Sequence, residues 1–221
     1  MTRPPVPRLL LVTDRRQARA DLVDTLAAAV EVVPTGAADD VAVLLRDRDL
    51  PAGPRARLAG RLAERLAPRG IRLLIAGDPV LAARVGAAGV HLAAHEALPT
   101  GVRPGLLTRS CHDRDEVRAG VRDRLDALVV APVAPTRSKP GHGPALGTGG
   151  VRRLATEAGA TPVLALGGVD VASVPHWLAQ GAWGVAVMGA LMRTDAPDAL
   201  VADLLAALAA AAPSSTTGAR P

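Results

Sequence analysis

Short apolar runs alternate with helix-like segments along almost the whole chain, and this alternation constrains the fold more than any other feature. Apolar runs predict eight strands, at 8–14, 40–46, 71–78, 89–92, 105–110, 126–132, 161–168 and 183–189. Amphipathic spacing and helix-boundary residues predict seven helices, at 20–30, 54–70, 79–89, 113–124, within 147–159, 170–181 and 198–211. Because the strands are unbroken apolar runs, they are typical of a parallel sheet buried on both faces.

The number and order of these segments favour a (β/α)₈ TIM barrel, an α/β fold in a single domain. A doubly wound open sheet is the alternative, but no G-x-G-x-x-G sequence follows the first strand. We expect an N-terminal extension at 1–7, the barrel at 8–212 and a disordered tail at 213–221. No helix is predicted between the strands at 89–92 and 105–110, which indicates an opened entrance or a misplaced boundary.

The charge pattern argues against nucleic-acid and membrane partners. The chain has 26 Lys and Arg residues against 21 Asp and Glu, and the basic residues are scattered among aspartates, as in RDRLDAL. There is no Phe and no Tyr to stack on bases. No stretch is typical of a signal peptide or of a membrane span, and one cysteine, Cys111, excludes an internal disulfide framework. We therefore expect a cytoplasmic protein, and the sequence leaves homo-oligomerisation open.

Residues that follow the strands form the candidate site, because barrels carry their active sites at the carboxyl ends of the strands. The turns at Gly167–Gly168 and Gly189, after the last two strands, offer backbone N–H groups that can approach a phosphate closely. The alternative is that these glycines only close turns. Arg46 and Arg48 follow the second strand, and guanidinium groups suit phosphate oxygens. The pattern predicts a phosphorylated substrate and a second phosphorylated group, such as a pyrophosphate, across the mouth.

Two acidic residues near the same mouth predict a Mg²⁺ site. Asp78 and Glu96 would hold the ion between them, and phosphate and water would complete its coordination. For Asp78 the alternative is a structural role, as the N-cap of a helix that begins at Pro79. His91 is interpreted as a structural histidine, and Cys111 as a buried thiol rather than a nucleophile.

The only lysine of the chain, Lys139, lies in a loop rich in proline and glycine, within VVAPVAPTRSKPGHGPALG (129–147). An ammonium group is a compact, mobile point charge, and the planar fork of an arginine does not replace it. The interpretation is that Lys139 contacts phosphate. The alternative is that one lysine among 26 basic residues lies there by chance.

Seven stretches in this order resemble the thiamine phosphate synthase/TenI (thiazole tautomerase) superfamily over about residues 8 to 195. They are LLLVTD, LLRDRD, LLIAGDPVLAARVGAAGVHL, RSCHDRDEV, DALVVAPVAPTRSKPG, PVLALGGV and GAWGVAVMGALM. In the synthases, hydroxymethylpyrimidine pyrophosphate loses pyrophosphate and joins the nitrogen of a thiazole phosphate. The resemblance therefore implies a transferase of thiamine biosynthesis that takes two small phosphorylated substrates and Mg²⁺.

The resemblance also implies roles for the candidate residues. Arg46 and Lys139 would hold the pyrophosphate, and Ser110 would add a hydrogen bond. Asp78 and Glu96 would carry Mg²⁺. Together with His112 as a general acid/base, Arg46, Ser110 and Lys139 form the expected catalytic set. The expected substrate-binding residues, including the cradle of the thiazole phosphate, are Arg48, Thr136, Ser138, Gly167, Gly168, Met188 and Gly189.

The chain departs from the synthase pattern where the pyrimidine ring and the metal are bound. The pattern Q-x-R-x-K on the second strand is Leu44, Arg46 and Arg48 here, and the Asn before Asp78 is Gly77. The sequence GQED after the fourth strand is AAHE, and the Ser of the eighth strand is a glycine. Most polar groups that would read the pyrimidine are gone, whereas those for phosphate persist.

Three functions therefore remain after the resemblance. The first is a synthase with a divergent pyrimidine site. The second is a TenI-like tautomerase that acts on thiazole carboxylate phosphate. Some tautomerases carry a histidine where this chain has Pro132, so His112 or His142 would substitute for it. The third is a non-catalytic regulator that binds thiazole phosphate.

Overall fold

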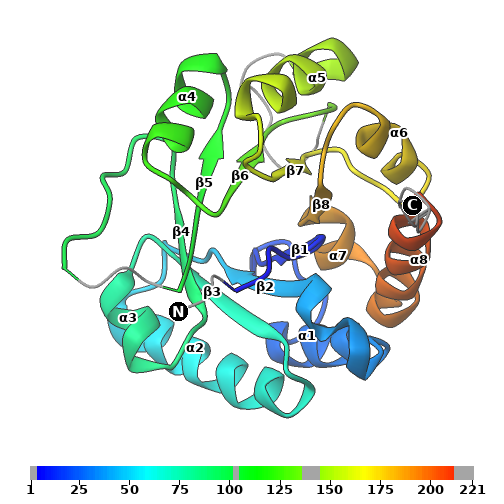
Figure 1. Cartoon of the computed structure of the whole chain (residues 1–221). Coiled ribbons are helices and arrows are strands. Elements are labelled where there is room, and N and C mark those ends of the chain that lie inside the picture. The colour runs from blue at the N-terminus through cyan, green and yellow to red at the C-terminus, as the bar shows by residue number, and fades with distance from the viewer. Residues whose placement is uncertain (1–3, 102–104, 136–144, 212–221) are drawn as a thin grey trace, which may run out of the picture.

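A computed structural model describes residues 4–101, 105–135 and 145–211, and it shows a closed barrel of eight parallel strands. The strands are β1 (Leu9–Val12), β2 (Val41–Leu45), β3 (Arg72–Ala76), β4 (Gly89–Leu92), β5 (Leu106–Cys111), β6 (Ala127–Val130), β7 (Val163–Leu166) and β8 (Gly184–Val187). Each strand pairs with the next in chain order, and β8 pairs with β1 to close the barrel (Figure 1). The predicted (β/α)₈ barrel is confirmed.

Helices surround the strands on the outside of the barrel (Figure 1). They are α1 (Leu22–Glu31), α2 (Ala52–Leu66), α3 (Pro79–Arg84), α4 (Arg114–Arg122), α5 (Gly147–Ala158), α6 (Val174–Ala179), α7 (Gly189–Arg193) and α8 (Pro197–Ala210). Two 3₁₀ helices lie at Thr35–Asp40 (η1) and Ala67–Arg69 (η2). Between β4 and β5 the described residues, 93–101 and 105, contain no helix, in line with the predicted gap. The short helices η1 and α7 were not predicted from the sequence.

Polar and glycine residues set several helix boundaries. The side chain of Asp78 accepts a hydrogen bond from the N–H of Leu81 (2.8 Å), and that of Asp113 accepts one from Glu116 (2.9 Å), so α3 and α4 begin with side-chain caps. The predicted helix at 79–89 is wrong at its end. Gly86 takes a positive φ of 65°, which a helix does not allow, and the chain turns there into β4.

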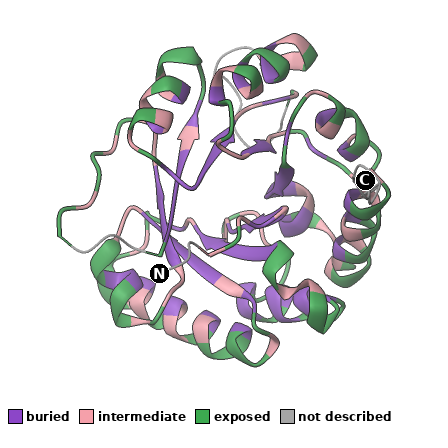
Figure 2. Ribbon diagram, in the orientation of Figure 1, coloured by how far each residue is buried: buried purple, intermediate pink, exposed green. Residues whose placement is uncertain are grey.

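Alternate strand residues point into the barrel and out toward the helices, and they form two apolar clusters. Outward residues such as Leu9 and Leu11 pack with Leu26 and Leu62 of the helices. The inner cluster consists of Leu10, Val12, Ala42, Leu44, Leu74, Ala76, Leu106, Val129, Leu164, Ala186 and Met188. Figure 2 shows that the strands are largely buried, whereas each helix is buried on one side and exposed on the other.

The described N-terminal residues contact the barrel. Trp183, which precedes β8, donates its indole N–H to the carbonyl of Val6 (3.3 Å), and Arg72 donates to the carbonyl of Pro5. The guanidinium of Arg8 lies 5.7 Å from the Trp183 ring centre, within the range of a cation–π contact. The predicted extension therefore packs against the fold where it is described.

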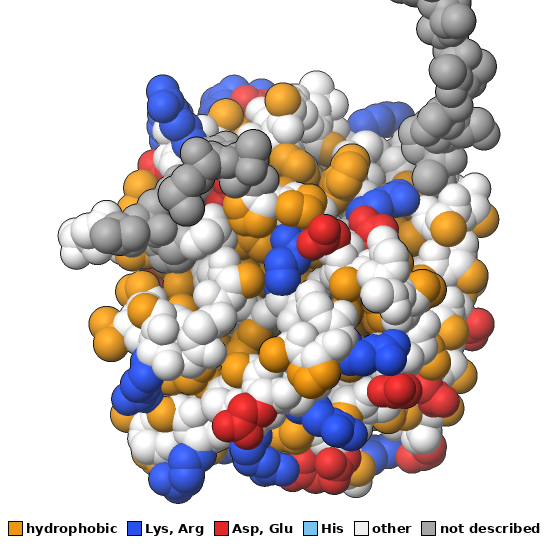
Figure 3. Space-filling model, turned by 60° about the horizontal axis from the view of Figure 1, so that its bottom comes forward, with side chains coloured by type: hydrophobic (Ala, Val, Ile, Leu, Met, Phe, Trp, Pro, Cys, Tyr) orange, Lys and Arg blue, Asp and Glu red, His pale blue; other side chains and the backbone are white. Residues whose placement is uncertain are grey.

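Charges of both signs are mixed on the surface. On the face in Figure 3, arginine side chains lie beside Asp and Glu side chains. Elsewhere on the molecule, Glu157 of α5 forms ion pairs with Arg114 (2.7 Å) and Arg118 (2.6 Å) of α4. None of the helices in the described ranges is long and apolar enough to cross a membrane.

We expect Leu62→Ala to lower the free energy of unfolding by about 2–5 kcal/mol, because it leaves a cavity between the helices and the strands. The Leu62 side chain is 0% exposed, whereas Leu98 is 40% exposed. The control Leu98→Ala should change the free energy of unfolding by less than about 0.5 kcal/mol. Denaturant unfolding of both variants measures the difference, and equal effects would contradict the described packing.

Candidate active site

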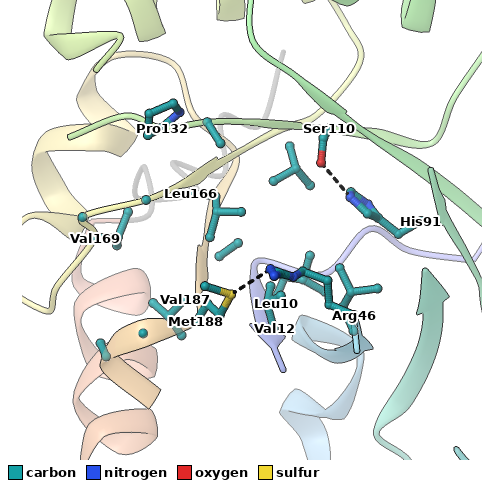
Figure 4. Close-up of a pocket in the computed structure, with 18 of the residues that line it drawn as sticks. Leu10, Val12, Arg46, His91, Ser110, Pro132, Leu166, Val169, Val187 and Met188 are labelled. Atoms are coloured by element: carbon teal, nitrogen blue, oxygen red, sulfur yellow. Dashed lines mark hydrogen bonds between the residues drawn. The ribbon is translucent and has the colours of Figure 1, made fainter. Parts of the chain in front are cut away.

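Two cavities adjoin at the carboxyl ends of the strands. The larger, of about 520 Å³, is lined mainly by apolar side chains, among them Leu10, Val12, Leu44, Val129, Leu166 and Met188 (Figure 4). The smaller, of about 330 Å³, is lined mainly by charged and polar side chains, among them Thr13, Asp14, Arg16, Asp47, Arg48 and Asp49. Arg46, His91 and Ser110 line both. We call the larger the apolar cavity and the smaller the charged cleft.

Arg46 follows β2, and its side chain reaches across the mouth toward Met188 (Figure 4). Its Nη1 lies 3.6 Å from the Met188 sulfur, and its Nη2 lies 3.8 Å from the carboxylate of Asp14. A thioether is a weak acceptor and the ion pair is long, so these contacts leave the guanidinium able to bind an anion. Arg46 therefore presents positive charge at the junction of the two cavities, where it was predicted to act.

A buried carboxylate between Arg46 and Arg48 holds the backbone of this mouth. Asp47 is 4% exposed and accepts hydrogen bonds from Thr13 Oγ1 (2.5 Å) and from the backbone N–H of Arg15 (2.8 Å). Thr13 Oγ1 in turn accepts from the backbone N–H of Arg46 (2.9 Å). These bonds join the ends of β1 and β2, so Asp47 fixes the two residues that carry the guanidinium groups. The sequence reasoning did not single it out.

Ser110 is held by a buried histidine (Figure 4). The ring of His91 lies 2.8 Å from Thr108 Oγ1 through Nδ1 and 2.9 Å from Ser110 Oγ through Nε2. Burial disfavours the charged ring and lowers the pKa of His91 from 6.5 to about 4. The neutral ring donates through one nitrogen and accepts through the other, which orients both hydroxyl groups. His91 has both nitrogens satisfied, as a structural histidine would, yet it also lines the site.

Arg48 and Glu96, predicted for substrate and for metal, bind each other. Arg48 Nη2 donates to Glu96 Oε1, and Glu96 Oε2 accepts from the backbone N–H of Ala93 at 2.7 Å. Burial acts to raise the pKa of Glu96, but the hydrogen bonds from Ala93 and Arg48 hold it below its usual value. The pair lies against Gly77, where a Cβ atom would come within 2.8 Å of Glu96 Oε1 and 2.9 Å of Arg48 Cζ.

Asp78 is the N-cap of α3, which is the structural role given as the alternative to metal binding. One of its oxygens caps α3, and the other lies 3.6 Å from Nη1 of Arg55, a residue that is 8% exposed. Arg55 also donates to the carbonyl of Ala76 (2.6 Å) at the end of β3. Arg55 thus ties the start of α3 to the strand before it.

Carboxylate oxygens are the donors that Mg²⁺ prefers, so Asp78 and Glu96 fit the ion by chemistry. Their present partners are cations and N–H groups, and neither residue lines the apolar cavity or the charged cleft. The described ranges contain no cluster of three or more His, Cys, Asp or Glu side chains placed to share a metal ion. Binding of Mg²⁺ between Asp78 and Glu96 would require Glu96 to leave Arg48.

The glycines after β7 are needed for close packing. Gly167 and Gly168 have φ values of 98° and 71°. A Cβ atom would lie 3.0 Å from Pro132 at the first and 2.7 Å from the carbonyl of Pro135 at the second. The turn after β7 therefore packs against the segment after β6, as the turn-closing interpretation requires. Both glycines also line the apolar cavity, so their predicted phosphate contact remains a prediction.

The end of the cavity at β8 holds a cation that the sequence reasoning missed. Gly189 and Met188, both predicted, line the cavity together with Arg193, the last residue of α7. Arg193 donates to the side chain of Gln17. The sequence could have indicated Arg193 through its spacing of four residues from Gly189, because residues at this spacing share a helix face.

Two further residues considered in the sequence analysis, Cys111 and His112, follow Ser110 in the chain. His112 lines the rim of the apolar cavity with its side chain 49% exposed, and its Nδ1 lies 3.0 Å from Glu116. Cys111 is 0% exposed, and burial raises the pKa of its thiol to about 12. The prediction that Cys111 is buried is confirmed. Thr136, Ser138 and Lys139, with Arg137 and His142, lie outside the described residues.

The match to a family model spans this site. The model described as thiamine monophosphate synthase (TMP-TENI) matches residues 9–191, which include all eight strands. The chain belongs to this family. The resemblance drawn from the sequence motifs is confirmed.

Relatives named thiamine-phosphate synthase are similar along most of their length. The protein from Salinispora tropica is 36% identical over 208 residues, which cover 91% of this chain and 97% of that one. The protein from Mycolicibacterium smegmatis is 33% identical over 218 residues and covers 92% of each chain. Among solved structures, the thiamine phosphate pyrophosphorylase from Pyrococcus furiosus has a TM-score of 0.78 at 22% identity and covers 93% of this chain and 97% of that one. The structural match supports the same barrel fold.

His91 should make the stability of the protein depend on pH. Its pKa is about 4 in the fold against 6.5 for an unperturbed histidine, so between these pH values the unfolded chain binds a proton that the folded protein does not. The free energy of unfolding should therefore fall by about 3 kcal/mol as pH is lowered from above 6.5 to 4. Urea unfolding at several pH values measures the slope. His91→Gln should flatten it between pH 5 and about 6.5, and an unchanged slope would contradict the assignment.

Proposed function

We propose that this protein is a thiamine-phosphate synthase, a transferase of thiamine biosynthesis. It joins hydroxymethylpyrimidine pyrophosphate to thiazole phosphate and releases pyrophosphate. The observation that carries the proposal is the position of Arg46 between an apolar cavity and a charged cleft. A substrate with an organic ring and a pyrophosphate has the same division into an apolar part and a charged part.

The apolar cavity is the proposed site of the two rings. Its walls come from aliphatic side chains such as Val12, Leu44 and Val129, which offer shape and dispersion contacts to flat rings. They also exclude water, which would otherwise compete with the thiazole for the electrophilic carbon. The volume of about 520 Å³ lies within the usual range for small-molecule sites.

Bond making and breaking take place at the junction. The bond between the pyrimidine methylene carbon and the pyrophosphate oxygen breaks, and its electron pair leaves with the pyrophosphate. The lone pair of the thiazole nitrogen forms the new carbon–nitrogen bond. Negative charge grows on the leaving group, and Arg46 stabilises it there. The hydroxyl of Ser110, oriented by His91, supplies a hydrogen bond on the same side.

The charged cleft is the proposed site of the pyrophosphate. Arg48 lines it, and Lys139 is proposed to approach the same anion from the loop after β6. Asp78 and Glu96 would hold Mg²⁺, and the ion would supply positive charge that offsets the charge of the pyrophosphate. At the other end of the apolar cavity, Gly168 and Gly189 are proposed to bind the thiazole phosphate through backbone N–H groups.

The remaining substrate-binding residues are proposed to contact the thiazole phosphate. Gly167, Met188 and Arg193 lie at the thiazole phosphate end, and Thr136 and Ser138 are proposed to reach it from the loop after β6. The partners are thus two small phosphorylated molecules. We place the protein in the cytoplasm, because such charged substrates do not cross a membrane unaided.

Arg46→Ala should reduce kcat/KM for product formation by about 10²–10³-fold, because it removes the cation at the leaving group. The assay mixes the full-length protein with hydroxymethylpyrimidine pyrophosphate, thiazole phosphate and Mg²⁺ and measures pyrophosphate. Arg118→Ala is the matched control, since Arg118 pairs with Glu157 outside the barrel. It should retain the wild-type rate.

Pyrophosphate release must need both substrates if the proposal is correct. No release by the wild type, with thiazole carboxylate phosphate isomerised instead, would replace the synthase with a tautomerase. His112 at the rim of the cavity is the observation that favours this second candidate, because an imidazole there can donate or accept a proton at a bound ring. Binding of thiazole phosphate without either reaction would leave a non-catalytic binder.

A further inference from the structure

The Arg48–Glu96 pair places opposite charges together at a mouth that must bind an anion. Arg48 lines the charged cleft, and its side chain is 44% exposed. Glu96 is 18% exposed and is anchored by the backbone N–H of Ala93 (2.7 Å). The carboxylate is therefore the fixed partner of the pair, and the guanidinium is the partner with freedom to move.

Gly77, which lies against the pair, also helps to keep Arg48 beside Glu96. Gly77 has a φ of 65°, and a Cβ atom there would lie 2.8 Å from Glu96 Oε1 and 2.9 Å from Arg48 Nη2. The absence of a side chain at this position gives the guanidinium a place beside the carboxylate. Without an anion in the cleft, Arg48 is thus held against Glu96, and its charge is neutralised.

We propose that Glu96 is an internal competitor for Arg48, and that pyrophosphate binding makes Arg48 exchange the carboxylate for the anion. The inference rests on the proposed function, since it assumes a pyrophosphate in the charged cleft. Glu96 then sets how tightly the cleft holds pyrophosphate. A weaker hold favours release of pyrophosphate after the reaction, at the expense of ground-state affinity.

The exchange makes chemical sense for both partners. Arginine binds phosphate oxygens through two N–H groups, and this contact replaces its bond to Glu96. Glu96 keeps its hydrogen bond to Ala93 but loses its bond to Arg48, so it disfavours the exchange without preventing it. The contribution of such a pair at a partly exposed site corresponds to a change of about fivefold in affinity at most.

Glu96→Gln tests the competition with little change in shape. The amide oxygen retains the bond to Ala93, and the amide N–H₂ group then faces Arg48 and offers it no acceptor. Calorimetry would measure the binding of inorganic pyrophosphate to the full-length protein in the presence of EDTA, which removes divalent cations. Glu96→Gln should tighten binding by about fivefold. The control Glu157→Gln removes a carboxylate that pairs with two arginines outside the barrel, and it should leave the affinity unchanged.

Simple removal of a negative charge must be separated from release of Arg48. The gain from Glu96→Gln should be lost in the double variant with Arg48→Ala if it comes from release of Arg48. A gain that is as large when Arg48 is absent would overturn the inference.

The exchange itself is visible in the side-chain NMR signal of Arg48 in ¹⁵N-arginine-labelled protein. The signal is assigned by its loss in Arg48→Ala. In the wild type it should shift on addition of pyrophosphate to the position that it has in pyrophosphate-bound Glu96→Gln. An unshifted signal at saturating pyrophosphate would overturn the inference. If turnover of the two organic substrates is present at the same time, the proposed function stands and only the competition by Glu96 fails.

Discussion

The interior of the barrel is filled mainly by aliphatic side chains, and the site depends on this constraint. The chain has no Phe and no Tyr, so strands buried on both faces must fill their inner side with Ala, Val, Leu and Met. Ala42, Ala76 and Ala186 are too small to meet across a barrel of eight strands. Six residues of the inner cluster also line the apolar cavity, namely Leu10, Val12, Leu44, Val129, Ala186 and Met188. The inner cluster and the proposed ring-binding site therefore share these side chains.

Charged groups at the mouth form pairs, and hydrogen bonds to the backbone hold these pairs in place. Asp47 joins the ends of β1 and β2, and its bonds place Arg46 and Arg48 on either side of it. Arg55 connects Asp78 to the end of β3, because it pairs with the Asp78 carboxylate and donates to the carbonyl of Ala76. Because such partly buried charges are costly without partners, the pairs keep the mouth in one arrangement before a substrate arrives. An anion then competes with existing carboxylates rather than with water alone.

The sequence alone predicted the fold and most of the elements, because eight apolar runs alternate with seven helix-like segments along the chain. It also singled out Arg46, Ser110 and Gly189, which line the apolar cavity, since each ends a predicted strand. It could not predict which charges pair, because the partners Arg48 and Glu96 are far apart in the chain and meet only when β2 and β4 take their places. Arg193 was not predicted as a site residue because the boundary of the last strand was misplaced. The predicted last strand ran to residue 189, where α7 in fact begins.

Three departures from the synthase pattern are better understood as one structural change. Gly77 has no side chain, and the space above its Cα is occupied by Arg48 and Glu96. Each of these is longer than the Lys or Asp of the pattern, and the extra length brings the guanidinium and the carboxylate into contact over the glycine. A larger residue at 77 would require the side-chain ends of Arg48 and Glu96 to shift and would also have to adopt a φ of 65°. The glycine, the arginine and the glutamate therefore form one local arrangement at the ends of β2, β3 and β4.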